Sequence, residues 1–442
     1  MIDLRIASSD LAALRAALLG HKNEQCAVLL ASRLEHGRHA LLVREIILPG
    51  DADYTERSPI RAELRPEFVA RVTKRAKLAD VSLVFVHTHP GDQLPRFSVS
   101  DDEGERELAA FLARRGLKER HAALVLSEGG CCARALASSE LIRIVSVGDR
   151  LMVEFDPYSK ESEVSPIFDR QVRAFGAQGQ QVLHTLRVGI VGLGGTGSIA
   201  AQQLTHLGVR DFVLIDPDHI ELINLNRVVG AGEADIGRPK SEVARRHIQA
   251  IAPAASVRSV VGDVVHAAVA KELLETDVIL CCTDSHGSRS VVQQVVYQYL
   301  IPCIDIGSTI AAQNGQVTGV FGRVQLLGPD QPCLWCSGLL NSEEVRRDMM
   351  NTFERKADPY MQGVHEPAPS VISLNGTVVS LAVTMLLGIV TAVPVGPRHI
   401  IYNASASTLR PVRATAQAGC FICSHEGVLA RGDLQALFAR ED

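Results

Sequence analysis

The sequence predicts an α/β protein with two domains, on the strength of three patterns. Apolar strand-like runs recur among stretches of helical spacing along the 442 residues. The run 188–191 passes through a glycine-rich turn into a helix. A polar, proline-bounded stretch at 156–166 has the composition of a linker. We therefore expect a first domain over 1–155, a linker over 156–166 and a second domain over 167–442.

Composition restricts the classes of partner. A net charge of −5 gives no basic surface for nucleic acid, so no such partner is expected. The N-terminal residues lack the charged and apolar regions of a secretion signal, which predicts a cytoplasmic protein. The ten cysteines then favour reduced thiols, metal sites or small buried side chains over disulfides.

One apolar run, 371–395, has the length of a membrane span. Polar or small residues interrupt it, so we expect a buried helix and no membrane partner. These interruptions are Ser373, Asn375, Gly376, Thr377 and Ser380.

The first domain begins with a mixture of helical and strand patterns. Helical spacing covers 9–19 and 66–77, and strands are expected over 26–31, 40–48 and 81–86. Together they indicate an α/β domain with a central sheet.

The strand over 81–86 ends in His87 and His89, which project to the same side because side chains alternate along a strand. Both can reach one cation, and Asp101, a short loop later, can complete a three-ligand zinc site with water in the fourth position. The alternative is a polar loop with incidental histidines. The joint occurrence of His-x-His, Ser98 and Asp101 after an apolar strand favours the metal site.

These residues resemble the motif of the JAMM (JAB) metallopeptidases, in which a glutamate precedes a strand and His-x-His-x7-Ser-x2-Asp follows. The resemblance implies a catalytic zinc ion held by His87, His89 and Asp101. It also implies that Ser98 helps to stabilise the tetrahedral intermediate and that Glu24 is the general base. Such a set performs metal-assisted hydrolysis of an amide.

Two alternatives remain open within this motif. Eight residues, not seven, separate the second histidine from the serine, which makes Asp102 a substitute for Asp101 as ligand. Glu45 also lies beside a strand and competes with Glu24 as the base.

The second domain begins with the spacing G-x-G-x-x-G after the strand 188–191. Small residues let the backbone approach an anion, and the following helix N-terminus supplies N–H groups and a positive dipole end. The next strand, 212–216, ends in Asp216, an acid placed to accept from ribose hydroxyls. A dehydrogenase and a nucleotidyltransferase fit these features equally well. The glycines of the turn are Gly192, Gly194, Gly195 and Gly197.

Further polar residues separate these two enzyme classes. Asn224, Arg227 and Lys240 follow the ribose acid, and a strand over 277–284 ends in Asp284. Cationic side chains offset the charge of a triphosphate, and a carboxylate at a strand end can hold magnesium. A dehydrogenase needs no such set, so nucleotidyl transfer is favoured.

With this set the chain resembles the ThiF/MoeB group and, through it, ubiquitin-activating enzymes, over about 168–424. The resemblance implies a Rossmann-like adenylation domain with a mostly parallel sheet that binds ATP and Mg²⁺. The glycines would form the phosphate loop and Asp216 would bind ribose. Asn224, Arg227 and Lys240 would contact the phosphates, and Asp284 would bind magnesium.

Two C-x2-C pairs predict a second, structural zinc site. Cys333 and Cys336 form the first pair, and Cys420 and Cys423 form the second. Four thiolates close a tetrahedral zinc site, and the same pairs occur in ThiF/MoeB relatives. Four buried thiols are the alternative. Chelation of such a zinc ion should destabilise the fold without stopping the chemistry directly.

A nucleophilic cysteine is missing where the family often has one. The loop around 361–369 contains none, and Val364 stands where one would align. Cys281, Cys282 and Cys303 lie in apolar strands and are expected to be core residues. The sequence therefore predicts adenylation and leaves thioester formation open.

The expected activity combines both domains. The second domain would adenylate the C-terminal carboxylate of a ubiquitin-like protein, and the first would cleave peptide or isopeptide bonds at that terminus. A sulfur-carrier pathway is the first alternative, and a scaffold that only binds the carrier is the non-enzymatic one. A conjugating enzyme is a further expected partner. Arg170 matches an arginine that reaches the ATP of the neighbouring subunit in homodimeric relatives, so a homodimer is expected.

Overall fold

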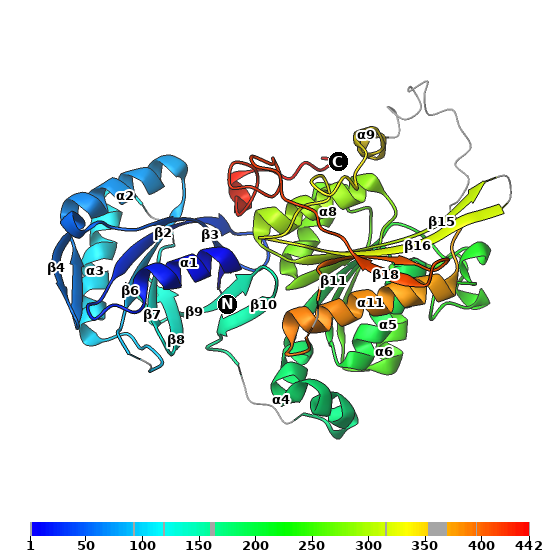
Figure 1. Cartoon of the computed structure of the whole chain (residues 1–442), viewed down its shortest axis with the longest axis horizontal. Helices are drawn as coiled ribbons and strands as arrows, with labels where there is room; N and C mark the ends of the chain where they lie inside the picture. The colour runs from blue at the N-terminus through cyan, green and yellow to red at the C-terminus, as the bar shows by residue number, and fades with distance from the viewer. Residues whose placement is uncertain are drawn as a thin grey trace. The chain divides into compact units, whose positions relative to one another are not determined.

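The strands form two large sheets in the computed structural model of this chain (Figure 1). The structure describes residues 2–91, 93–117, 120–159, 164–313, 316–351, 369–394 and 396–441, and for residue 313 the backbone alone. It divides into two units. Unit 1 is Met1–Glu161, Gln298–Leu300 and Val428–Ala436, and unit 2 is Ser162–Tyr297, Ile301–Gly427 and Leu437–Asp442.

Unit 1 contains a mixed sheet in the order β1-β3-β2-β6-β7-β8-β9-β10. Strand β1 pairs in parallel with both β3 and β9, so the sheet closes on itself at this strand. A separate pair, β4 and β5, is antiparallel. The strands of unit 1 are β1 (Asp3–Ala7), β2 (Cys26–Leu34), β3 (Ala40–Ile47), β4 (Tyr54–Ser58), β5 (Arg61–Leu64), β6 (Ser82–Thr88), β7 (Ala122–Ser127), β8 (Gly130–Ala135), β9 (Leu141–Val147) and β10 (Leu151–Phe155).

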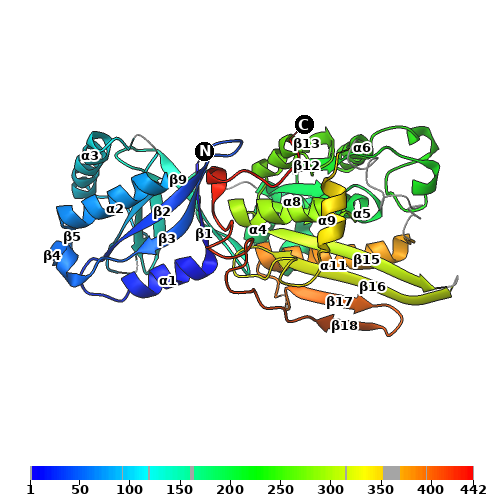
Figure 2. The ribbon, with the colours of Figure 1, turned by 90° about the horizontal axis from the view of Figure 1, so that it is seen from above.

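Helices cover both faces of this sheet, and Figure 2 shows α1 (Ser8–Leu18) and α2 (Pro66–Ala79) on opposite sides. Successive side chains of β2 point to opposite faces of the sheet, so this strand contacts a helix on each face. Leu29 packs with Leu14 of α1, whereas Leu30 packs with Phe68 of α2. The third helix, α3 (Val99–Arg114), contributes Leu112 to the cluster around α2. Unit 1 is thus an α/β layer structure, as predicted from its periodicity.

Unit 2 contains a sheet in the order β13-β12-β11-β14-β15-β16-β17-β18. The first five strands in this order are parallel, and the last three extend the sheet in antiparallel fashion. The prediction of a mostly parallel sheet is therefore correct for the glycine-loop half and misses the antiparallel extension. The strands are β11 (Arg187–Val191), β12 (Asp211–Asp216), β13 (Ser256–Val261), β14 (Val278–Cys281), β15 (Cys303–Gln313), β16 (Gln316–Leu327), β17 (His399–Asn403) and β18 (Thr408–Pro411).

Figure 1 shows α8 on one face of this sheet and α5, α6 and α11 on the other. Helix α11 is long and apolar enough to cross a membrane by length and composition, and 56% of its most apolar window is buried. It packs against α5, β15 and β16, which agrees with the prediction of a buried helix. The last two residues of α8 belong to unit 1. The α-helices described for unit 2 are α4 (Asp169–Thr185), α5 (Gly195–Leu207), α6 (Lys240–Ile251), α7 (Ala267–Ala270), α8 (His286–Tyr299), α9 (Ser342–Met349) and α11 (Ile372–Val390).

Candidate functional site

The first candidate site lies at the carboxyl edge of the parallel strands of unit 2. Strands β12, β11 and β14 are neighbours, and they reach this edge at Asp216, Val191 and Cys281. The chain order reverses between β11 and β14, and ligands of open α/β sheets bind at such a reversal. The glycine loop, Asp216 and Asp284 all follow these strand ends, so the topology brings three predicted site elements together.

The glycine loop has room for an anion on one side and none on the other. Gly192 has a φ of +86°, and a Cβ there would lie 3.0 Å from the backbone of Cys282 and Thr283. A Cβ on Gly197 would overlap the carbonyl oxygen of Gly192. A Cβ on Gly194, the residue that caps α5, would meet no atom within 4 Å. The loop is therefore tight against β14 and open at the N-terminus of α5, where a phosphate fits.

Asp216 holds this loop in place. One carboxylate oxygen accepts from the backbone N–H of Leu193, and the other accepts from that of Asp218 at 2.8 Å. Burial raises the pKa of Asp216, although Lys240 and these hydrogen bonds oppose the shift. Each carboxylate oxygen can accept a second hydrogen bond, so these two bonds leave room for a ribose hydroxyl. The contact with ribose stays a prediction.

The predicted phosphate-contacting residues follow β12, and Arg227 among them lies beside the glycine loop. Arg227 donates to the carbonyl oxygen of Ile223 at 2.6 Å, and its side-chain stem lies beside Gly195. Lys240 pairs with Asp218, with 2.8 Å between Nζ and Oδ2. Asn224 is buried and accepts from the backbone N–H of Glu221 at 3.1 Å. Their roles toward a nucleotide stay predictions.

Asp284 lies three residues beyond the end of β14, not within the strand as the sequence suggested. Its side chain is exposed. The loop that carries it is held by Asp348 of α9, which accepts from Ser285 Oγ at 2.8 Å and from the backbone N–H of Gly287 at 2.9 Å. An exposed carboxylate on a fixed loop at the strand edge can bind a magnesium ion.

Comparison with known proteins agrees with this geometry, because residues 168–421 match the family described as "ThiF family".

The chain belongs to the ThiF family.

Two curated relatives each cover more than half of the chain. The chain is 30% identical over 259 residues to the molybdopterin-synthase adenylyltransferase of Escherichia coli. The aligned segment makes up 58% of this chain and 95% of that protein. The chain is 29% identical over 248 residues to the sulfur carrier protein ThiS adenylyltransferase of the same organism, covering 55% and 88%. A solved structure of E. coli MccB is 18% identical with a TM-score of 0.49, covering 59% of this chain and 76% of that one.

The two C-x2-C pairs of the ThiF domain come together as predicted. The sulfurs of Cys333 and Cys420 are 3.6 Å apart, and those of Cys336 and Cys423 are 3.7 Å apart. Four thiolates about 2.3 Å from one zinc ion would be separated by about 3.8 Å, so these distances fit a tetrahedral site. The hydrogen bond between Cys333 and Cys423 lowers the pKa of the Cys423 thiol and raises that of the Cys333 thiol, so Cys423 is the more readily ionised of the two.

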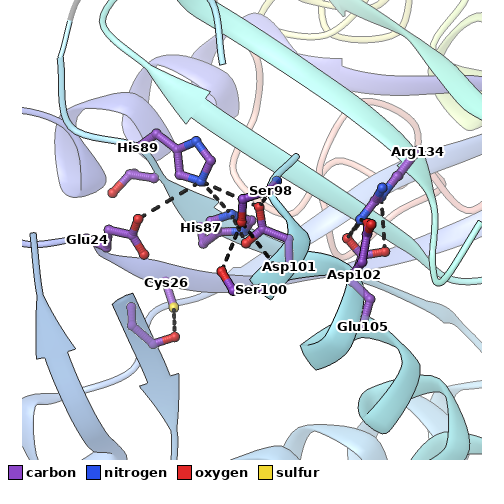
Figure 3. Close-up of polar contacts among 12 residues, drawn as sticks. Glu24, Cys26, His87, His89, Ser98, Ser100, Asp101, Asp102, Glu105 and Arg134 are labelled. Atoms are coloured by element: carbon purple, nitrogen blue, oxygen red, sulfur yellow. Dashed lines mark hydrogen bonds and ion pairs between the residues drawn. The ribbon is translucent and has the colours of Figure 1, made fainter. Parts of the chain in front are cut away.

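A second candidate site lies in unit 1, where the predicted peptidase residues meet (Figure 3). His87 Nε2 lies 3.2 Å from His89 Nε2 and 3.1 Å from Asp101 Oδ1, and His89 Nε2 lies 3.7 Å from Asp101 Oδ2. Burial lowers the pKa of His89, and the neighbouring His87 lowers it further. Both effects favour the neutral imidazole, which is the form that binds a metal. These three side chains could hold one ion.

Asp101 and Ser98 also have a structural role. They form the capping box of α3, in which Ser98 N–H donates to Asp101 Oδ2 at 2.6 Å and Asp101 N–H donates to Ser98 Oγ at 3.2 Å. Burial alone would raise the pKa of Asp101, but its contacts with His87 and Ser98 outweigh burial and lower it. The cap therefore fixes the carboxylate facing the histidines.

Strand register accounts for the position of Glu24. Cys26 of β2 pairs with His87 of antiparallel β6, and Thr88 N–H donates to the carbonyl oxygen of Gln25. Continuing this register places Glu24 opposite His89, and Glu24 Oε1 lies 4.0 Å from His89 Nε2. Burial raises the pKa of Glu24, against the effect of His87. A carboxylate here can exchange a proton with a water between these groups.

The two alternative carboxylates, Asp102 as ligand and Glu45 as base, are each paired with an arginine. Asp102 pairs with Arg134 at 2.6 Å (Figure 3), and Glu45 pairs with Arg75 at 2.7 Å. Neither carboxylate belongs to the described cluster of His87, His89 and Asp101. The geometry therefore favours Asp101 as ligand and Glu24 as base.

The remaining predictions concern the dimer and the missing nucleophile. Arg170 is exposed on α4. The loop around Val364 lies outside the described residues. Cys281 and Cys303 are buried in neighbouring strands, as expected of core residues. Cys282 is partly exposed as a residue, although burial raises the pKa of its thiol.

Two features of unit 2 escaped the sequence analysis. Asp305 is fully buried between Arg289, at 3.1 Å, and Arg323. Asn375 of α11 reaches the glycine loop, where a Cβ on Gly195 would overlap its amide nitrogen. The only signal for Asn375 was a polar residue inside an apolar run.

Proposed function

We propose that the ThiF domain adenylates the C-terminal carboxylate of a carrier protein with ATP and Mg²⁺. In this reaction a carboxylate oxygen attacks the α-phosphorus of ATP, the bond to the β-phosphate oxygen breaks, and pyrophosphate leaves. The product is an acyl-adenylate. The convergence of the glycine loop, Asp216 and Asp284 at the reversal of strand order carries the proposal.

Different groups of the chain would bind the phosphates, offset their charge and hold the magnesium ion. The N-terminus of α5 faces open space at Gly194 and would bind phosphate oxygens. Arg227 and Lys240 would offset the charge that accumulates on the phosphates, and Asp284 would hold the magnesium ion. Lys240 is now paired with Asp218, so binding of a triphosphate would compete with that ion pair.

We favour a sulfur-carrier protein as the substrate over a conjugated ubiquitin-like modifier. The names of the two relatives above, which act on molybdopterin synthase and on the sulfur carrier ThiS, support this choice. In that pathway the adenylate would be converted to a thiocarboxylate. Conjugation through a separate conjugating enzyme is the second candidate.

The test is ATP–pyrophosphate exchange with a candidate carrier and with the same carrier lacking its last two residues. Exchange should require the intact C-terminus and Mg²⁺. Mass spectrometry of the carrier then separates the pathways, because a thiocarboxylate supports sulfur transfer and an isopeptide supports conjugation. NAD reduction without ATP consumption would establish the dehydrogenase instead. Carrier binding without any exchange would establish the scaffold.

We also propose that unit 1 is a zinc peptidase that acts at the C-terminus of the same carrier. His87, His89 and Asp101 would hold the ion, which would supply an activated water for amide hydrolysis. Glu24 would accept the proton of that water and pass it to the leaving amine, and Ser98 would donate to the oxyanion. The distances of 3.1 to 4.0 Å among these side chains support the proposal. Zinc content and cleavage of a carrier fusion test it.

We further propose a structural zinc ion at the four cysteines and a homodimer in which Arg170 reaches the partner's ATP. The sulfur distances support the zinc ion. The exposure of Arg170 is compatible with the dimer. Metal analysis and the mass of the native protein test these two proposals separately.

A further inference from the structure

A buried amide contacts the glycine loop from a helix far away in the sequence. Asn375 lies in the first turns of α11 and is 1% exposed, within a helix whose other buried residues are mainly apolar. Burial of an amide is costly unless its polar atoms have partners. The contacts of Asn375 therefore indicate why a polar side chain stands there.

Two hydroxyl groups fix the orientation of this amide. Ser308 Oγ of β15 donates to Asn375 Oδ1 at 3.1 Å, and Asn375 Nδ2 donates to Ser370 Oγ at 3.1 Å. Both ends of the side-chain amide therefore have a hydrogen-bond partner. An amide nitrogen carries two N–H groups, and Ser370 accepts from one of them.

The nitrogen end of the amide packs on Gly195, the first residue of α5. A Cβ on Gly195 would overlap Asn375 Nδ2 and would lie 3.4 Å from Cδ of Arg227. The backbone at Gly195 is helical and its φ is not positive, so the conformation itself does not require glycine. The amide of Asn375 therefore accounts for the glycine at this position.

We propose that Asn375 is a positioning residue of the adenylation site, which holds the first turn of α5 so that its N–H groups face the phosphates of ATP. Ser308 and Ser370 hold the amide of Asn375 by hydrogen bonds, and the amide packs on Gly195 and so positions the glycine loop. This proposal rests on the proposed adenylation, because it needs ATP at the glycine loop. It adds α11 to the elements that build the nucleotide site.

The first test is the affinity for a non-hydrolysable ATP analogue, measured by calorimetry with Mg²⁺ on the full chain. Asn375→Asp keeps the shape and the acceptor for Ser308 but loses the N–H donors and adds a negative charge beside the loop. Asn375→Ala removes the shape, the acceptor and the donors, and adds no charge. Both variants should weaken binding by about tenfold or more, because each loses the Asn375–Ser370 hydrogen bond that holds the amide against the first turn of α5. Thr384→Ala, which alters an exposed hydroxyl bonded only within α11, should bind as the unaltered chain does.

The second test measures the contact without nucleotide. Gly195→Ala should lower the melting temperature because the new methyl group meets Asn375. In the Asn375→Ala background the same change should cost markedly less, since the overlapping atoms are gone. Equal costs in both backgrounds would overturn the proposed contact. Should Asn375→Ala fail to fold, Asn375→Asp carries the binding test.

The outcomes separate this proposal from the adenylation on which it rests. An unaltered chain that does not bind the ATP analogue contradicts the proposed function. An unaltered chain that binds it, together with Asn375 variants that bind equally well, contradicts only the role of Asn375. Weaker binding in both variants with intact affinity for the carrier supports the proposal.

Discussion

Asp216 and Asp284 are both acids at the carboxyl edge of one sheet, yet their environments differ. Asp216 is buried and accepts two backbone N–H groups, whereas Asp284 is exposed on a loop. Loss of an acceptor for buried donors is costly, while loss of an exposed carboxylate affects only what it binds. Substitution should therefore separate a structural acid from a metal-binding one.

Asp284→Ala should abolish magnesium-dependent pyrophosphate exchange and leave the melting temperature nearly unchanged. Asp216→Ala should weaken ATP binding and also lower stability by about 1–3 kcal/mol, because the N–H groups of Leu193 and Asp218 lose their acceptor. Exchange assays and thermal melts on both variants check this. A stable Asp216→Ala protein would contradict its role in the loop.

If Glu24 is the base of the proposed peptidase and not a ligand, Glu24→Gln should abolish carrier cleavage while zinc content stays near one ion at the histidines. Glu45→Gln is the matched control, since Glu45 contacts Arg75 and should leave cleavage unchanged. Zinc analysis and a cleavage assay measure both effects. Cleavage that survives in Glu24→Gln, or is lost in Glu45→Gln, would reverse the assignment.

The elements that carry these residues were largely predictable. Periodicity located α1, α2, β2, β3, β6, β11 and β12 within a few residues. The His-x-His motif and the glycine spacing are local in sequence, so their residues could be named in advance. The sequence named Glu24 ahead of Glu45 through the resemblance alone. The pairing of Cys26 with His87, a register between strands that the sequence does not state, gives the physical reason why Glu24 lies beside the histidines.

Contacts between distant segments were not predictable. Asn375 reaches Gly195 only because α11 packs on α5, and Asp348 holds the Asp284 loop only because α9 lies at the N-terminus of α8. The antiparallel strands β16 to β18 lack a local signal of comparable strength. Tertiary packing, not propensity, determines these features.

At the level of elements, the four cysteines join the segment after β16 to the segment after β18. Cys423→Ser should lower the thermal stability of the protein and reduce its zinc content by one ion, because a zinc site with three thiolates binds less tightly. A chelator should reproduce the effect. Cys281→Ser, at a buried cysteine outside the cluster, is the control for zinc content and should retain the ion. Loss of stability without loss of zinc would argue for four buried thiols.

At the level of the whole molecule, unit 1 includes two segments that sequence order does not suggest. Residues 298–300 and 428–436 belong to it, although they follow the glycine-loop strands in the chain. Asp433 accepts from the backbone N–H of Glu35 at 2.7 Å and from Tyr299 OH at 3.2 Å. A domain boundary predicted at a single linker assigns every later residue to the second domain, so it misses these two segments of unit 1.

Asp433→Ala should therefore destabilise unit 1 by about 0.5–1.5 kcal/mol, because it removes the acceptor of the Glu35 N–H and of the Tyr299 hydroxyl at a site that water can reach. Glu441→Ala, at an exposed position near the same end of the chain, is the control. Hydrogen exchange of β2 amides in the full chain measures the effect locally. Unchanged protection of β2 would show that the terminal segment adds no stability there.

The proposed dimer gives the last prediction. An acyl-adenylate is labile in water, so a family member without a loop thiol must pass its carrier directly to an external nucleophile or shield the adenylate until one arrives. Arg170 is exposed on α4 and would complete the ATP site of the partner subunit. Arg170→Ala and Asp284→Ala should each be inactive in pyrophosphate exchange as homodimers. A mixed dimer should regain about one active site, since one of its two sites would combine an intact Asp284 with an intact Arg170. Exchange assays after mixing, with native mass spectrometry to count mixed dimers, measure the recovery. A fully active monomer, or mixed dimers without activity, would contradict the composite site.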